Sequence, residues 1–189
     1  MNAITVLKDD HKRIKELFRR YERLGNGARK SKQRLVEQMT RELAEHSSIE
    51  ETVFYPECRS RVPDADGDVL ESLEEHHIVK WTLDELSKST PADERYDAKV
   101  RVLMENVRHH IDEEEHELFP EVARQLTRRE LSEIGESLQA ARAIAPTRPH
   151  PRAPDEPPGN LVATIASTPL DIARDRVEAA VGALTGSER

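Results

Sequence analysis

Apolar side chains recur along this chain at alternating intervals of three and four residues, the spacing that gathers them on one face of an α-helix. The pattern runs over residues 3–24, 30–55, 68–87 and 92–123, so it predicts four long amphipathic helices. Stretches containing Gly or Pro separate them and predict short turns. Four long helices joined by short turns predict an all-α fold, an antiparallel up-down four-helix bundle.

Each predicted helix carries ionisable side chains inside its apolar stripe. The six residues concerned are His11, His46, Glu50, His76, His110 and Glu114. On the second and the fourth helix the histidine and the glutamate are one helical turn apart, so they share one face. An ionisable side chain on a buried face is costly unless it has a partner. We therefore expect these six side chains to interact.

The chain contains an internal duplication that relates these residues. The sequence HSSIE, followed by FYPE, begins at His46, and the similar sequence HIDEE, followed by LFPE, begins at His110. A weaker match at nearly the same offset joins DHKRIK, from Asp10, to EHHIVK, from Glu75. The chain thus resembles a duplicated helical hairpin, and each half has one early histidine and one later His-x3-Glu.

In an up-down bundle the six side chains lie at one depth. A buried layer of four imidazoles and two carboxylates without partners is unfavourable by several kcal/mol, whereas two cations would turn the same groups into ligands. Imidazole and carboxylate without thiolate suit iron or manganese. The sequence therefore predicts a two-metal site with positions left open for O2, NO or peroxide. A metal-free structural bundle is the alternative.

The sequence also contains a second possible metal arrangement, because the Glu-x2-His spacing of ferritin-like di-iron bundles occurs at Glu74 and Glu113. Both glutamates fall outside the apolar stripes, which disfavours it. His76 and His77 are adjacent and point about 100° apart on a helix, and the fuller stripe favours His76. The remaining histidines are expected to face solvent or surround the ligands: His77, His109 and His116.

The order His, His-x3-Glu, His, His-x3-Glu resembles the hemerythrin-like, or HHE cation-binding, domain, and the resemblance covers about residues 3–124. It implies a four-helix bundle that holds a non-haem di-iron centre, two iron ions with an oxo or hydroxo bridge. It further implies two histidine pairs, one for each iron, and two bridging glutamates: His11 with His46, His76 with His110, and Glu50 with Glu114.

The chain departs from the oxygen-carrying hemerythrins on the third helix, where those proteins have two histidines one turn apart. Here Lys80 follows His76 by one turn, and Trp81 follows His77. One ligand fewer puts stable O2 storage in doubt. The set of four histidines and two glutamates looks more like bacterial di-iron proteins that repair iron centres after nitrosative or oxidative stress. Those proteins carry an N-terminal cysteine-bearing domain that this sequence does not show.

We therefore expect a non-haem di-iron binding protein that binds O2, NO or peroxide in a stress-response or sensing role. The alternatives are a di-iron oxidoreductase that consumes peroxide or NO, and an iron-centre repair protein. The residues do not choose among these small ligands.

The predicted organisation has four parts. Residues 1–125 form the hemerythrin-like bundle, and residues 126–144 form an additional helix packed on it. Residues 145–160 form an extended Pro-rich linker, and residues 161–189 contain a C-terminal tail helix. The sequence does not identify a protein partner for the tail helix.

Composition narrows the remaining function classes. The net charge is −8 and the Lys and Arg residues are interspersed among acids, so no basic face for nucleic acid is expected. Cys58 is the only cysteine, which excludes an internal disulfide and a thiolate zinc site. No apolar run approaches the roughly 20 residues that span a bilayer, and the N-terminus does not resemble a signal peptide. A cytoplasmic location is therefore expected.

Overall fold

The computed structural model describes residues 1–155, 159–160, 163 and 166–171. Every regular element within these residues is helical, which confirms the all-α prediction. Most of the predicted tail helix lies outside the described residues.

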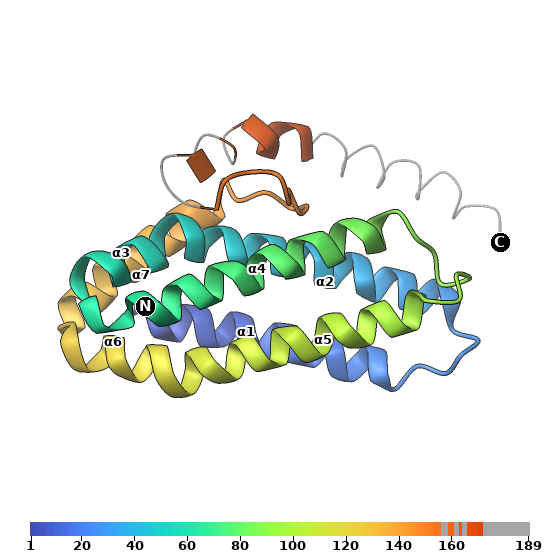
Figure 1. Cartoon of the computed structure of the whole chain (residues 1–189), viewed down its shortest axis with the longest axis horizontal. Helices are drawn as coiled ribbons and strands as arrows, with labels where there is room; N and C mark the ends of the chain where they lie inside the picture. Colours follow the sequence, from blue (N-terminus) through green and yellow to red (C-terminus); the bar gives the residue numbers. More distant parts are fainter. Residues whose placement is uncertain (156–158, 161–162, 164–165, 172–189) are drawn as a thin grey trace.

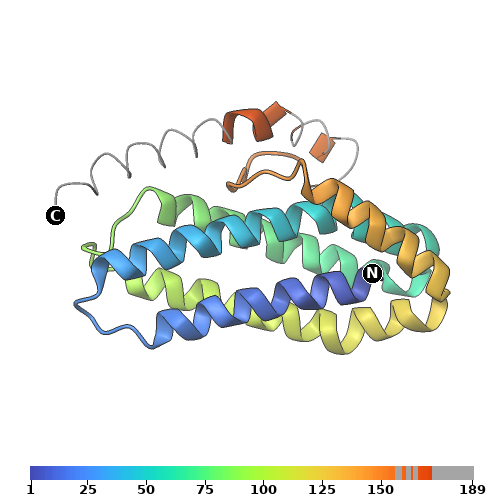
Figure 2. The same ribbon diagram turned by 180° about the vertical axis from the view of Figure 1, so that it is seen from behind.

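Four long helices form the body of the molecule: α1 (Ala3–Glu22), α2 (Arg29–Ile49), α4 (Asp66–Ser87) and α5 (Tyr96–Glu113). They lie side by side and alternate in direction along the chain (Figures 1 and 2). The predicted antiparallel up-down bundle is therefore confirmed. The predicted starts of the second, third and fourth helices are close to the observed ones, and the largest difference is at α5, which begins only after the turn that ends at residue 95.

The buried hydrophobic side chains form two clusters with a polar layer between them. Along α1, Leu7 belongs to the first cluster and Ile14 to the second, and His11 lies between them. Along α4, Leu73 and Val79 are separated in the same way, by a buried histidine. The polar layer therefore interrupts an otherwise apolar core, as the stripe pattern predicts.

The second and fourth predicted helices are not α-helical throughout, because each contains a π-helical turn near its end. After α2 the chain passes through η1 (Glu50–Phe54) into α3 (Tyr55–Arg61). After α5 it passes through η3 (Glu114–Leu118) into α6 (Phe119–Gln125). Each π turn begins at one of the two glutamates that the resemblance assigns as bridging.

Proline explains the change of register. Pro56 and Pro120 each lie in the first turn of the helix that follows a π turn. In an α-helix a prolyl ring clashes with the carbonyl group one turn earlier and lacks the N–H that would bond to it. The wider i→i+5 register ahead of each proline relieves that clash, so the helix continues instead of ending.

An additional helix, α7 (Arg128–Arg142), follows the bundle, and the 3-10 turn η2 (Pro63–Ala65) precedes α4. The Thr127 side chain caps α7, and Glu130 completes a capping box. α7 packs against α1, α2 and η1. This is the contact expected of residues 126–144, although the division of the chain into four parts remains a prediction.

The described part of the predicted linker lies against the bundle, near α2 and α4 (Figures 1 and 2). The Asn160 Nδ2 donates to the Glu51 carbonyl oxygen at 2.8 Å. The prolines therefore do not hold this segment away from the bundle as an extended spacer.

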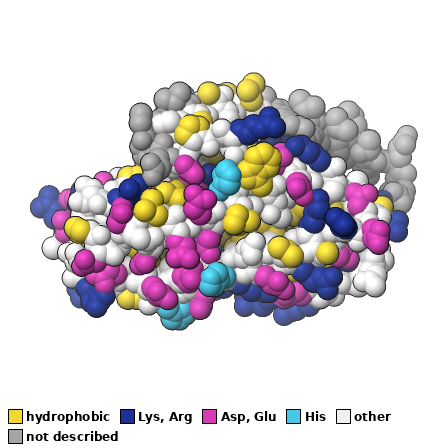
Figure 3. Space-filling view, viewed as in Figure 1, with side chains coloured by type: hydrophobic (Ala, Val, Ile, Leu, Met, Phe, Trp, Pro, Cys, Tyr) yellow, Lys and Arg dark blue, Asp and Glu magenta, His cyan; other side chains and the backbone are white. Residues whose placement is uncertain are grey.

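The surface carries acidic and basic side chains mixed together on the face drawn in Figure 3. Within the described residues, no helix is both long enough and apolar enough to cross a bilayer.

Candidate metal centre

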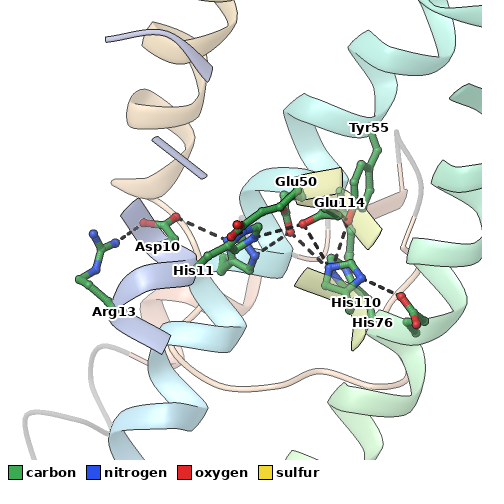
Figure 4. Close-up of polar contacts among 12 residues, drawn as sticks. Asp10, His11, Arg13, Glu50, Tyr55, His76, His110 and Glu114 are labelled. Atoms are coloured by element: carbon green, nitrogen blue, oxygen red, sulfur yellow. Dashed lines mark hydrogen bonds and ion pairs between the residues drawn. The ribbon is translucent and has the colours of Figure 1, made fainter. Parts of the chain in front are cut away.

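All six candidate side chains are buried, with at most 4% of each residue exposed. They come from every long helix and from both π turns, and they meet inside the bundle (Figure 4). Their donor atoms form two groups, each within 4.8 Å of one another, that share one carboxylate: His11, His46, Glu50 and Glu114 in the first, and Glu50, His76 and His110 in the second.

Glu50 lies between the two groups. Its Oε2 is 3.2 Å from the Nε2 of His46 and 3.5 Å from the Nε2 of His76. One carboxylate oxygen therefore faces a histidine of each pair.

Glu114 has the corresponding position on the other side of the layer. Its Oε2 is 3.1 Å from the Nε2 of His11 and 3.5 Å from the Nε2 of His110. Its Oε1 accepts a hydrogen bond of 3.0 Å from the hydroxyl of Tyr55, which is also buried. Sequence reasoning does not select Tyr55 for the site, although this residue lies in the repeated segment after His-x3-Glu.

Several buried polar atoms at the centre have no hydrogen-bond partner. They are the Nε2 atoms of His11 and His46, both carboxylate oxygens of Glu50, and the Oε2 of Glu114. A buried polar atom without a partner costs about 1–3 kcal/mol. Cations coordinated by these atoms would remove that cost, so the donor set fits bound metal.

The opposite ring nitrogen of each histidine, Nδ1, faces a carboxylate outside the centre. The Nδ1-to-oxygen distances are 2.9 Å for His11 with Glu115, 3.5 Å for His46 with Asp10, 2.9 Å for His76 with Glu51, and 2.8 Å for His110 with Glu75. A carboxylate at Nδ1 fixes the ring and leaves Nε2 for a cation. Metal-binding histidines nearly always donate from their other ring nitrogen to a carboxylate, a backbone carbonyl or water. The sequence analysis does not identify these four outer carboxylates.

The outer carboxylates follow the same duplication as the ligand candidates. Asp10 and Glu75 each directly precede an early histidine, and Glu51 and Glu115 each directly follow a central glutamate. The repeat therefore contains a signal for them. The apolar stripes do not select them, because side chains next to the ligand candidates point away from the stripe.

A lysine accompanies two of these carboxylates. The Lys15 Nζ donates to Glu115 at 2.9 Å, and the Lys80 Nζ donates to Glu51 at 2.6 Å. The two lysines occupy equivalent positions in the repeat, at the ends of DHKRIK and EHHIVK. The approximate two-fold relation of the site thus extends to its outer charges.

Comparison with known proteins agrees with this geometry. The family model for the hemerythrin HHE cation binding domain matches residues 2–122. This chain belongs to the hemerythrin HHE family. Membership of this family and the buried His/Glu clusters together fit a metal-binding protein.

Relatives of this HHE protein include an uncharacterized hemerythrin-like protein from Schizosaccharomyces pombe, 32% identical over 138 residues, which cover 72% of this chain and 68% of the relative. A crystal structure of a hemerythrin HHE cation binding domain-containing protein from Mycobacterium kansasii aligns with a TM-score of 0.66 and 26% identity. That alignment covers 76% of this chain and 86% of the other. A DNA nickase from a Nostoc species is 27% identical over 76% of this chain, but the match spans only 40% of the nickase.

Burial and neighbouring charges shift the pKa values of buried side chains at the HHE centre in both directions. Burial, followed by the nearby charge of Glu114, raises the pKa of Glu50 well above its ordinary value. Burial would also raise the pKa of Glu114, but His110 and His11 outweigh it and lower that pKa to about 2. Burial, followed by the charge of His110, lowers the pKa of His76 well below its ordinary value, which favours the neutral imidazole that binds metal.

The histidines predicted to lie outside the HHE centre do so. His77 is exposed, and its Nε2 accepts a hydrogen bond of 3.0 Å from the Trp81 indole nitrogen. His109 and His116 are exposed as well. Glu74 also faces solvent, so the ferritin-like arrangement has no support in the structure.

Proposed function

We propose that this chain is a non-haem di-iron protein that binds O2, NO or peroxide, in a stress-response or sensing role. One observation carries the proposal. Four imidazoles and two carboxylates are buried together, and each imidazole has its Nδ1 turned to an outer carboxylate. In this arrangement the Nε2 atoms and the carboxylate oxygens are oriented to coordinate cations.

Two ions are proposed because the donors divide into two groups. His11 and His46 would hold one iron, and their ring centroids are 4.9 Å apart. His76 and His110 would hold the other, and their Nε2 atoms are 3.1 Å apart. The two glutamates would bridge the irons, since each contacts one histidine of each pair. The bound irons would supply open coordination positions for a small ligand.

The remaining residues at the centre orient and shield the ligands. Tyr55 provides a buried hydroxyl 3.4 Å from the Nε2 of His76 and 3.0 Å from Glu114, and burial raises its pKa, which keeps the hydroxyl protonated. Lys80, at the position where oxygen-carrying hemerythrins have another histidine, pairs with Glu51 instead. Lys80 therefore adds a charge outside the centre, and the centre has one potential ligand fewer than in those hemerythrins.

The same smaller ligand set favours a second candidate, a di-iron oxidoreductase that consumes peroxide or NO, or an iron-centre repair protein. More open coordination gives room for reaction as well as for binding. The number of equivalents of NO or peroxide consumed per centre separates binding from turnover.

The test is a titration of the iron-loaded full chain with NO and, separately, with hydrogen peroxide, followed by absorption spectroscopy. We expect one stable adduct per centre with at least one of the two probes. Consumption of many equivalents per centre would favour the oxidoreductase. If neither probe changes the spectrum, the proposed binding of NO and of peroxide is contradicted.

The matched variants for this test are His110→Gln and His109→Gln, which alter adjacent residues on α5. His110 is buried in the centre, whereas His109 is exposed. The response should be lost in His110→Gln and kept in His109→Gln. An equal response in the two variants would place the reaction elsewhere.

A further inference from the structure

The four outer carboxylates do not contact their histidines equally. Three of the Nδ1-to-oxygen distances are 2.8 or 2.9 Å, but the distance from the Nδ1 of His46 to the Oδ2 of Asp10 is 3.5 Å. Of the four histidines, only His46 has a buried Nδ1 without a hydrogen-bond partner. The imidazole of His46 is therefore the least supported of the four.

Competition for Asp10 accounts for this difference. Asp10 is buried, and its Oδ1 pairs with Arg13 of its own helix (Figure 4). Its Oδ2, the oxygen that faces His46, pairs with Arg142 at the end of α7. A guanidinium is a strong donor to a carboxylate, so it holds this oxygen in competition with the imidazole.

The corresponding carboxylate in the second half has no such competitor. Glu75 is 2.8 Å from the Nδ1 of His110, and among the described residues no Lys or Arg side chain forms a salt bridge with it. The residue equivalent to Arg13 in the repeat is Ile78, which is exposed and apolar. Arg142 lies on α7, which follows the second copy of the repeat and is also outside residues 2–122, the part that matches the family model. It therefore has no equivalent in the repeat.

We propose that Arg142 is a positioning residue of the metal centre. By holding the Oδ2 of Asp10, it withholds that carboxylate from His46 and makes the His11/His46 position the weaker of the two cation positions. A carboxylate bonded to a ligand imidazole makes the imidazole more basic, so its withdrawal weakens the metal bond. The inference rests on the proposed two-cation site, and it makes the docking of α7 part of that site.

The test uses the metal-free full chain titrated with Co2+, with binding followed by calorimetry and by Co2+ absorption. In the wild type we expect two Co2+ ions to bind in two distinguishable steps. In Arg142→Gln, Asp10 can turn to His46, so the weaker step should tighten by roughly tenfold, the lower end of the effect of outer-shell partners on metal affinity. The Co2+ absorption of that step should change with it.

Three further variants separate positioning from a structural role. Arg142→Lys keeps the cation and should retain the wild-type steps. Arg129→Gln removes an exposed arginine of the same helix and should also match the wild type. In an Asp10→Asn background, Arg142→Gln should have no effect on the weaker step, because the carboxylate for which Arg142 competes is gone.

The inference is overturned if Arg142→Gln binds Co2+ as Arg129→Gln does, or binds it more weakly than the wild type. Arg142→Met, which keeps the apolar length of the side chain, provides the same comparison if Arg142→Gln does not fold. Failure of the wild type to bind two Co2+ ions would instead contradict the proposed function. The two failures are therefore distinguishable.

Discussion

At the scale of single residues, the direction of a side chain decides whether it can take part in the centre. His76 and His77 are adjacent on α4, yet one is buried against Glu50 and the other is exposed beside Trp81. The same substitution at His76 and at His77 therefore gives a matched test, because the two variants have the same composition and differ by one position in the sequence.

His76→Gln should lower the iron content of the purified protein, because it removes one of two imidazoles from the proposed second position. His77→Gln should leave iron content and absorption unchanged. Iron analysis of both variants after identical loading checks this. Equal iron content in the two would contradict the assignment of His76.

The six inner residues could be predicted from the sequence because each lies in an apolar stripe of its helix. The stripes do not select the outer residues, since Asp10, Glu51, Glu75 and Glu115 are sequence neighbours of the inner residues and fall outside the stripe. Their contacts depend on how one helix faces the next, which periodicity within a helix does not describe.

At the scale of elements, the positions of the long helices could be predicted well, but the π turns within two of them could not. A 3.6-residue period locates α1, α2, α4 and α5, but a π turn adds a residue to a turn without changing the residue types around it. The sequence predicts a helix end next to Pro56, whereas the π turn before this proline lets the helix continue. The π turns and their prolines occur at equivalent positions of the repeat, which is a signal that a single copy would not give.

The contact between α7 and the start of α1 gives a prediction about stability. A Cβ added to Gly135 would lie 2.1 Å from the Met1 carbonyl oxygen and 2.9 Å from the Ala3 nitrogen. Gly135→Ala should therefore destabilise the protein by roughly 1–3 kcal/mol, the usual cost of overpacking, although alanine favours helix. Urea unfolding of the metal-free protein measures this.

Gly67→Ala is the matched control, because a Cβ there meets nothing within 4 Å. It should be neutral or stabilise by about 0.4–1 kcal/mol. A stabilising Gly135→Ala would show that α7 does not pack on α1 as described.

At the scale of the whole molecule, a second polar contact joins three helices outside the centre. Asp97 of α5 accepts hydrogen bonds from the Tyr21 hydroxyl of α1 at 2.7 Å and from the Lys32 Nζ of α2 at 2.5 Å. The hydrogen bond from Lys32, more than any other interaction, lowers the pKa of Asp97 below its ordinary 3.8. Ionised Asp97 is therefore favoured in the folded state.

A lowered pKa in the folded state contributes stability above the unfolded pKa and loses it as the pH falls through the folded value. Asp97→Asn should therefore be less stable than the wild type at pH 7, and the difference should shrink at pH values below 3.8. Urea unfolding of the metal-free protein across this range measures it. Asp9→Asn, an exposed change on α1, is the control, and a constant difference for Asp97→Asn would contradict the assignment.

The chain beyond the bundle is the least predictable part at this scale. The stripe and cap of α7 are visible in the sequence, but the Pro-rich segment predicts an extended linker. Its described residues instead contact the bundle, through Asn160 and the Glu51 carbonyl among others. A contact made by one amide to one backbone carbonyl has no periodic signature.

The most direct test of the whole account is the number of iron ions per chain, measured with the absorption spectrum of the oxidised protein. We predict two irons per chain and the band of a bridged diferric centre in the wild type. Glu50→Ala and Glu114→Ala should each lose both irons together, whereas Glu117→Ala, an exposed change in η3, should keep them. A wild type without iron, or loss of a single iron from each glutamate variant, would contradict a centre in which six side chains hold two ions.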